Sequence, residues 1–251
     1  MGMPIRIDVR DPNITDQALE DAFQWFHHVD RTFSTYIPDS QISRLNAGLI
    51  DEASLDQDVR DVLNRCDQLR SETDGYFDIR TAELPLILAK GDGEPVRAGV
   101  DPSGYVKGWA VDRAAGILET AGASNYCVDA GGDVRVRGGA LPDEHWRVGI
   151  QHPTELDKVA AVVETSDAAI ATSGEYRRGR HIQDPHTGRP PEGVLSVTIV
   201  GPEVGTADAY ATAAFAMGDE GPRWTMSLTG YEAMTILSDK LVLSTPGFPK
   251  V

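Results

Sequence analysis

Apolar and polar residues alternate one by one near the N-terminus, and further along the chain the apolar residues recur every three or four positions. Residues 5–10 alternate one by one, which predicts a half-buried strand. From Thr15 to Phe33 the apolar residues recur every three or four positions, as in an amphipathic helix. The same spacing predicts a helix over 57–70, and the turn residues 38–40 lead into a short helical piece. Residues 76–79, after a turn, are expected to form a strand or an extended segment.

The second half of the chain is rich in strands. A helix is predicted to open near residue 104 and to stop at Gly122, and another starts at Thr206. A short helix is expected over 222–228. Strands are predicted at 125–130, 134–137, 146–151, 159–164, 168–171, 194–200, 232–237 and 241–244. Because strands and helices do not alternate, the pattern predicts an α+β fold with mixed or antiparallel sheets and packed helices, in a single unit over residues 1–251.

The charge and hydropathy of the chain limit the kinds of partner and the cellular location that we expect. Acidic residues outnumber basic ones 39 to 23, for a net charge of −16, which repels nucleic acid and excludes it as a general partner. No run of 18 apolar residues occurs, and no charged-then-apolar segment precedes the first strand. We therefore expect no membrane anchor and a cytoplasmic location, or an extracytoplasmic one if the chain was trimmed. Cys66 and Cys127 are expected to be buried small residues, and the sequence leaves a disulfide between them open without indicating one.

One pair of residues suggests metal chemistry. Asp208 and Thr212 are four apart in a predicted helix, so their side chains share one face. A carboxylate beside a hydroxyl suits a hard cation such as Mg²⁺. The alternative is structural, because an aspartate in a first helical turn also caps free N–H groups.

Other candidate residues lie in loops. The glycine-containing stretch around Gly104 enters a helix and could hold phosphate oxygens with help from Lys107, or could be a plain connection. His181 is suited to proton transfer near neutral pH, although loop histidines are more often simply solvated. Tyr36 could cover a flat ligand or merely pack. Residues 131–133, Gly-Gly-Asp, are typical of a hairpin turn.

Four stretches in a fixed order together resemble the ApbE-type FAD:protein FMN transferases. The stretches are residues 33–46, 101–112, 131–133 and 171–212. The resemblance implies a single α+β unit with two interleaved lobes that binds FAD, with Mg²⁺ at the pyrophosphate. It implies an enzyme, a transferase that moves FMN from FAD to a threonine or serine hydroxyl of an acceptor flavoprotein and releases AMP.

Carried over by position, the resemblance also implies a set of site residues. Asp208 and Thr212 would ligate Mg²⁺ through their side chains, and Gly104 through its backbone carbonyl. Ala211 stands where some relatives carry an acid, so Asp208 is expected to be the only carboxylate nearby and to serve one metal ion. His181 would be the general base on the acceptor hydroxyl. The residues implied to contact FAD are Met1, Tyr36, Phe77, Asp78, Ile79, Asp101, Lys107 and Gln183.

Two other functions remain open from the sequence. One is a Mg²⁺-dependent FAD pyrophosphatase, in which water replaces the acceptor hydroxyl. The other is a non-catalytic FAD-binding protein.

Met3 also replaces the threonine that is usual in the family, which changes one edge of the implied pocket.

Overall fold

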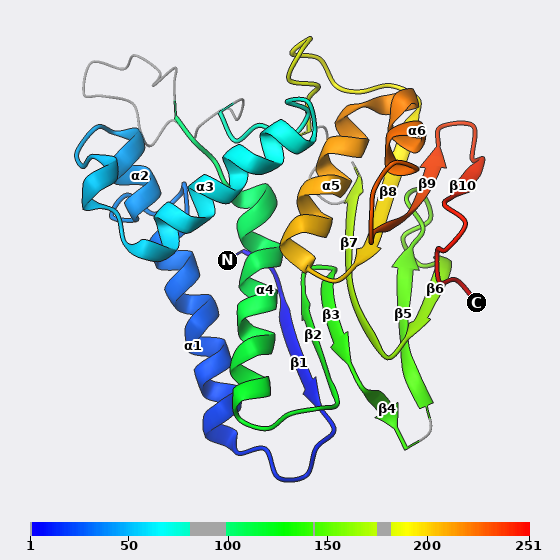
Figure 1. Ribbon diagram of the computed structural model, residues 1–251, viewed down its shortest axis with the longest axis horizontal. Helices are drawn as coiled ribbons and strands as arrows, with labels where there is room; N and C mark the ends of the chain where they lie inside the picture. The colour runs from blue at the N-terminus through cyan, green and yellow to red at the C-terminus, as the bar shows by residue number, and fades with distance from the viewer. Residues whose placement is uncertain (1, 81–98, 143, 175–181) are drawn as a thin grey trace.

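The computed structural model describes residues 2–80, 99–142, 144–174 and 182–251. Within these residues a seven-stranded sheet has the order β1-β2-β3-β7-β8-β9-β10, and every neighbouring pair is antiparallel (Figure 1). Its strands are β1 (Ile5–Val9), β2 (Tyr126–Ala130), β3 (Asp133–Arg137), β7 (Asp167–Gly174), β8 (Val194–Gly201), β9 (Glu232–Leu237) and β10 (Val242–Ser244). The register of β2 and β3 pairs Ala130 with Asp133 across a two-glycine turn.

A smaller sheet of three strands covers one face of the large one. It consists of β4 (Gly139–Leu141), β5 (Glu144–Gln151) and β6 (Val159–Thr165). Trp146 and Ile150 of β5 pack against Val134 and Val136 of β3 in a shared apolar cluster. Alternate residues of β3 therefore face the small sheet, and the residues between them, including Asp133, face the other way.

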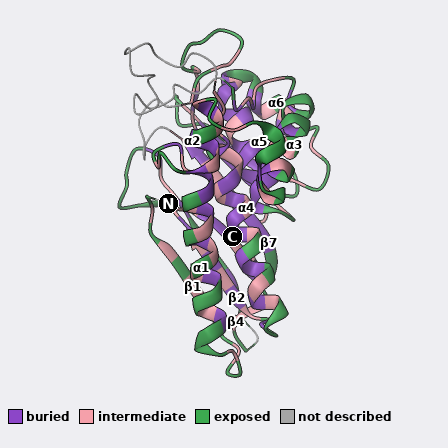
Figure 2. Cartoon of the chain, turned by 90° about the vertical axis from the view of Figure 1, so that its left-hand side faces the viewer, coloured by how far each residue is buried: buried purple, intermediate pink, exposed green. Residues whose placement is uncertain are grey.

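Helices cover the opposite face of the large sheet. The long ones are α1 (Asp16–Phe33), α4 (Ser103–Thr120) and α5 (Val204–Ala216), and α3 (Gln57–Glu72) crosses above them (Figure 1). Thr15 caps α1 by accepting a hydrogen bond from the Ala18 N–H. The short elements are α2 (Gln41–Asn46), α6 (Gly221–Thr225) and the 3-10 turns Glu52–Ser54 and Gly218–Glu220. Figure 2 shows that burial concentrates where the helices meet the sheet, and that the outward face of α1 is exposed.

The α+β prediction with an antiparallel sheet is confirmed, and three local predictions need correction. The turn expected at Asp74 and Gly75 is present, with positive φ angles at both, but residues 76–79 continue in bends and turns and form no strand. The helix expected from Thr206 begins at Val204, and α6 ends at Thr225. The polar stretch over 90–99, rich in glycine and charged residues, lies almost entirely outside the described residues.

Two further features of the described residues bear on the sequence expectations. Cys66 is buried, Cys127 is half-buried, and both are unpaired. Burial raises the pKa of each thiol to about 12, so neither is a reactive thiolate at neutral pH. In this part of the chain, no helix combines the length and the apolar character needed to cross a bilayer.

Candidate functional site

Three buried or nearly buried charged side chains meet where the start of α4, the middle of α5 and the β2–β3 turn come together. The Lys107 Nζ lies 2.7 Å from Asp133 Oδ2 and 3.7 Å from Asp208 Oδ2. The side chain of Lys107 is one-fifth exposed, whereas Asp133 and Asp208 are 1% and 4% exposed. Charged groups are rarely buried to this degree unless they are paired, so the cluster is the first candidate for a functional site.

The tight turn before β3 places Asp133 in this cluster. Gly131 and Gly132 have φ angles of 64° and 98°, a backbone conformation that favours glycine. The Gly132 N–H donates to Asp129 Oδ1 at 2.8 Å, which fixes the turn. A Cβ atom on Gly131 would stand 2.9 Å from the Sδ atom of Met3, so Met3 packs directly over the turn. Asp133 then begins β3 on the face that points toward the helices.

Asp133 is the site residue that the sequence reasoning missed. The Gly-Gly-Asp stretch was interpreted as a structural turn, and Asp208 was expected to be the only carboxylate nearby. That expectation is wrong, because Asp133 and Asp208 share one ammonium group and contact each other. The signal in the sequence was the carboxylate that directly follows a two-glycine turn in one of the four stretches.

Burial dominates the electrostatics of Asp133. It raises the pKa of Asp133, and the Lys107 ammonium and the contact with Asp208 oppose this shift. With both carboxylates ionised, the cluster has two negative charges and one positive charge in a water-poor place. A second cation beside Asp208 is therefore favoured by the charges that the chain itself supplies.

A hydroxyl pair lies one helical turn beyond Asp208. Thr212 Oγ1 is 3.3 Å from Ser173 Oγ on β7. Gly104 of α4 packs against the same threonine, since a Cβ atom there would be 3.8 Å from Thr212 Oγ1 and 3.3 Å from the ring of Phe77. The structure thus brings Gly104 and Thr212 together at one side of the cluster. Carboxylate, hydroxyl and carbonyl oxygens are hard donors, and this donor set fits Mg²⁺.

Helices α4 and α5 hold this donor set by packing side by side in opposite directions (Figure 1). A Cβ atom on Gly108 would stand 2.5 Å from the Val204 carbonyl oxygen, so only glycine permits this approach. Asp112 of α4 accepts hydrogen bonds from the backbone N–H groups of Val204 and Gly205 at 3.0 and 2.9 Å. Burial raises the pKa of Asp112 to about 6. The capping role considered for Asp208 belongs to Asp112, and Asp208 lies one turn into the helix.

Four residues implied to contact FAD lie next to the start of α4: Phe77, Asp78, Ile79 and Asp101. The Asp101 N–H donates to the Ile79 carbonyl at 2.8 Å, and Asp101 Oδ1 accepts from the Ser103 N–H at 3.0 Å. Asp78 pairs with Arg70 of α3 at 2.8 Å. Phe77 is buried against Gly104. The segment of Phe77, Asp78 and Ile79 therefore packs against the first turn of α4, next to the charged cluster.

The remaining predicted site residues lie at the surface or outside the described residues. Tyr36 is 71% exposed between α1 and α2, and Gln183 is also exposed. Gln183 precedes a turn in which Asp184 Oδ1 accepts from the His186 N–H. The His186 ring packs on Tyr76, with ring centroids 4.5 Å apart, so this loop lies against the segment that carries Phe77. Met1 and His181 lie outside the described residues.

Helix α3 is tied to α5 by a second set of polar contacts that the sequence did not reveal. Glu72 accepts from Arg65 at 2.6 Å and from the Tyr210 hydroxyl at 2.9 Å. Arg65 also donates to Thr206 Oγ1 at 3.3 Å. Burial, followed by the bond to Glu72, raises the pKa of Tyr210 to about 12, so this hydroxyl remains a donor at neutral pH. These contacts join the helix that precedes Phe77 to the helix that carries Asp208.

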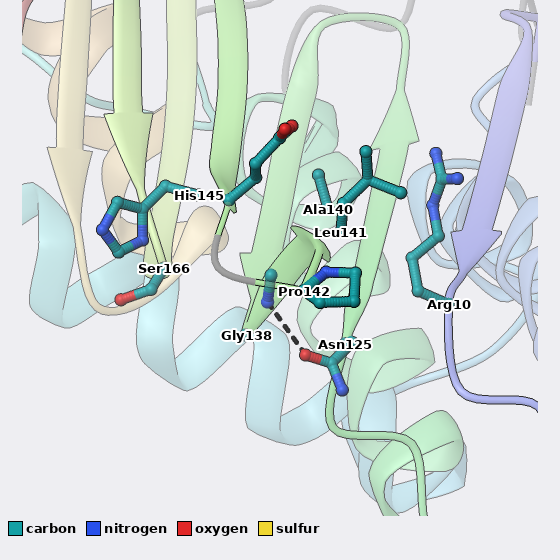
Figure 3. A pocket seen from close by; sticks show the side chains of 10 residues that line it. Arg10, Asn125, Gly138, Ala140, Leu141, Pro142, His145 and Ser166 are labelled. Carbon is teal, nitrogen blue, oxygen red and sulfur yellow. Dashed lines mark hydrogen bonds between the residues drawn. The ribbon is translucent and has the colours of Figure 1, made fainter.

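A hollow of about 730 Å³ lies elsewhere on the described surface (Figure 3). Arg10, Asn125 and His145 line it together with the residues of β4. Asn125 Oδ1 accepts from the Gly139 N–H at 2.9 Å there. Asn125 and Gly139 flank the ends of β2 and β3 that are remote from the Gly131–Gly132 turn. None of the lining residues belongs to the Lys107 cluster, so the hollow is a separate feature.

Comparison with solved structures shows which class of protein has this fold. The fold matches "Flavin Transferase ApbE from Vibrio cholerae" with a TM-score of 0.84 and 26% identity, covering 100% of this chain and 96% of that one. It matches the ApbE protein from Thermotoga maritima with a TM-score of 0.86 and 25% identity, covering 100% and 97%. The architecture is therefore that of the α+β proteins built like the flavin transferases.

Sequence comparison gives the family. The ApbE family profile matches residues 1–96 and 90–235. A curated relative from Vibrio cholerae serotype O1, named FAD:protein FMN transferase, is 30% identical over 84% of this chain and 77% of its own length. A relative of the same name from Escherichia coli K12 is 29% identical over 76% and 68%. The chain belongs to the ApbE family, as the four stretches of sequence indicated.

Proposed function

We propose that this chain, a transferase of the ApbE family, moves FMN from FAD to a threonine or serine hydroxyl of an acceptor flavoprotein, depends on Mg²⁺ and releases AMP. The observation that carries the proposal is the Lys107–Asp133–Asp208 cluster, with Thr212 and Gly104 beside it. Phosphoryl transfer depends on charge neutralisation and positioning more than on covalent help from the protein. A buried cluster of hard oxygen donors and one ammonium group supports that chemistry.

The donor set supports the Mg²⁺ dependence in this proposal. Asp208 and Thr212 would hold Mg²⁺ through their side chains, and Gly104 through its backbone carbonyl. When bound, Mg²⁺ neutralises charge on the pyrophosphate of FAD. Asp133 holds the Lys107 ammonium at 2.7 Å, which keeps that side chain pointed into the cluster.

The transfer itself needs one bond to form and one to break. The acceptor hydroxyl oxygen attacks the phosphorus on the FMN side of the pyrophosphate, and the bond from this phosphorus to the bridging oxygen breaks. AMP leaves with the bridging oxygen, and the proton of the hydroxyl passes to His181 as general base. Lys107 supplies positive charge as negative charge develops on the phosphate oxygens.

Several of the proposed flavin contacts lie beside this cluster, which supports their assignment. Phe77, Asp78, Ile79 and Asp101 lie at the entrance to α4, and the loop of Gln183 packs against the same segment through His186. Tyr36 is exposed and free to cover a ring of the cofactor. Met1 completes the proposed set.

A single incubation tests the proposal. The protein is mixed with FAD, Mg²⁺ and a purified acceptor flavoprotein domain, and acceptor mass, free FMN and AMP are measured. We expect the acceptor to gain the mass of one FMN, with one AMP released, only when Mg²⁺ is present. Release of FMN and AMP without a mass gain would show a pyrophosphatase instead. Unchanged FAD would show a binding protein.

A further inference from the structure

Two rows of residues four apart face each other across the α4–α5 contact. On α4 they are Gly104, Gly108 and Asp112, and on α5 they are Val204, Asp208 and Thr212. Gly104 meets Thr212 at one end, while Gly108 and Asp112 meet Val204 at the other. The two helices therefore run antiparallel in a defined register. The proposed metal ligands are drawn from both rows.

At the end of this contact that lies away from the metal ligands, the side chain of Asp112 binds the first backbone N–H groups of α5. Glu203 precedes α5 and gives the helix no side-chain cap of its own. Asp112, 92 residues earlier in the sequence, accepts from the Val204 N–H with one oxygen and from the Gly205 N–H with the other. A two-point contact of this kind fixes both the sliding and the rotation of α5, because each oxygen has its own donor.

We propose that Asp112 is a positioning residue that sets the register of α5 against α4, and through it the geometry of the divalent-cation site formed by Gly104, Asp208 and Thr212. The inference rests on the proposed function, because it concerns the same site. Asp208 is one turn along α5 from the groups that Asp112 holds, and Gly104 is two turns back along α4. A shift of either helix changes the spacing between the Gly104 carbonyl and the two α5 side chains. Mg²⁺ demands nearly ideal octahedral geometry, so such a shift weakens its binding.

Because the helices are in close contact, the hydrogen bonds of Asp112 depend on the chemical nature of the side chain as well as on its size. Gly108 and Gly205 leave no room between the helices, since a Cβ atom on Gly205 would stand 2.8 Å from the Tyr105 ring and 3.1 Å from the Trp109 nitrogen. An asparagine at position 112 keeps the shape of the side chain. Its amide nitrogen is a donor, however, and would face a backbone N–H, so one of the two hydrogen bonds is lost. This substitution therefore alters the register contact without opening a cavity.

The charged and titratable groups that interact with Asp112 come from several elements. They are Arg135 of β3, Glu203 before α5, Tyr105 on α4 and Tyr231 before β9. Arg135 favours the ionised form of Asp112, and Glu203 opposes it. Ionised Asp112 accepts at both oxygens, whereas the protonated acid turns one oxygen into a donor. We therefore expect the Mg²⁺ requirement of the wild type to rise as the pH falls through about 6, and Asp112→Asn to lack this inflection.

The experiment compares the wild type with Asp112→Asn and with the control Glu203→Gln, which changes a carboxylate at the start of α5 that does not touch the two N–H groups. Mn²⁺ binding to the FAD-loaded proteins is measured by electron paramagnetic resonance, the Mg²⁺ dependence of AMP release is titrated, and melting temperatures are recorded at pH 7.5. For Asp112→Asn we expect about tenfold weaker Mn²⁺ binding and a matching rise in half-maximal Mg²⁺, as for other residues that orient metal ligands. At saturating Mg²⁺ its rate should return close to that of the wild type. Glu203→Gln should match the wild type in Mn²⁺ affinity and in half-maximal Mg²⁺ at pH 7.5.

Several outcomes would decide against the inference. Unchanged Mn²⁺ affinity in Asp112→Asn would overturn it, and so would a loss in Asp112→Asn that Glu203→Gln shares. If Asp112→Asn does not fold, Asp112→Ser keeps one short acceptor, and its Mn²⁺ affinity must still fall. A wild type that binds no Mn²⁺ and shows no Mg²⁺ dependence would refute the proposed metal site itself. A wild type that binds Mn²⁺ as tightly as Asp112→Asn refutes only the role of Asp112.

Discussion

The Lys107 ammonium and the Asp133 carboxylate form a buried ion pair, with Nζ and Oδ2 separated by 2.7 Å. Asp208 lies on the other side of the ammonium, at 3.7 Å. One positive charge thus serves two carboxylates from different elements, β3 and α5. This arrangement links the Gly-Gly-Asp turn to the helix that carries the proposed metal ligands.

Removing the ammonium group should destabilise the fold. Lys107→Met leaves two buried carboxylates without their shared cation, and we expect a loss of about 3 kcal/mol in the free energy of unfolding at pH 7.5. The double variant Lys107→Met/Asp133→Asn should recover part of this loss, because it removes the uncompensated charge together with the lysine. Urea unfolding of the wild type, both single variants and the double variant measures the coupling. Purely additive effects would show that the ion pair is not a functional unit of the fold.

The titration of Asp112 should change how the free energy of unfolding depends on pH. Its pKa is raised by burial to about 6, above the value of 3.8 expected for an exposed carboxyl. The folded protein therefore holds this proton more tightly than the unfolded chain between about pH 4 and 6, and the associated stability is lost as the pH rises through that window.

Asp112→Asn does not titrate, so comparison with it isolates this effect. As the pH rises from 4 to 6, we expect the difference in unfolding free energy to move in favour of the variant by about 2–3 kcal/mol, and to stay constant above that range. Urea unfolding at half-unit pH steps measures it. A difference that stays flat between pH 4 and 6 would contradict the assigned burial of the charge.

His181 should affect the chemical step more than cofactor binding. As general base it contributes about 100-fold or more to the transfer rate, so His181→Ala should slow transfer by that order. The FAD dissociation constant, measured by flavin fluorescence, should change little. His186→Ala is the matched control, because its ring packs on Tyr76 and has no proposed proton to accept. Equal losses of rate and FAD affinity in His181→Ala would indicate a pocket residue instead of a base.

The elements that sequence patterns predicted well are those whose patterns are local. The alternation over residues 5–10 and the helical period from Thr15 to Phe33 correspond closely to β1 and α1. Two features depended on distant residues and were missed. Helix α5 starts at Val204 because Asp112 caps it from 92 positions away. Asp133 enters the site because β3 turns its side chain toward α4, and no local pattern shows which lysine it meets.

The candidate site was predicted in part for the same reason. Asp208 and Thr212 are four apart, so their shared helix face followed from spacing alone. Their meeting with Gly104 of α4 followed only from the family resemblance, because it depends on the Gly108 contact between the helices. The hydrogen bonds that join Arg65, Glu72 and Tyr210 connect residues on ordinary helix faces. No motif in the sequence indicates that these residues meet.

We expect Asp208 to hold the Mg²⁺ on which FMN transfer depends. The most direct measurement is the FMN mass gain of the acceptor across a Mg²⁺ titration, for the wild type, Asp208→Asn and the control Asp219→Asn, an exposed aspartate beyond the end of α5. We expect Mg²⁺-dependent transfer by the wild type and the control, and none by Asp208→Asn at Mg²⁺ concentrations that saturate the wild type. Asp133 is not expected to substitute, because Lys107 already occupies its carboxylate. Full transfer by Asp208→Asn at those concentrations would contradict the account.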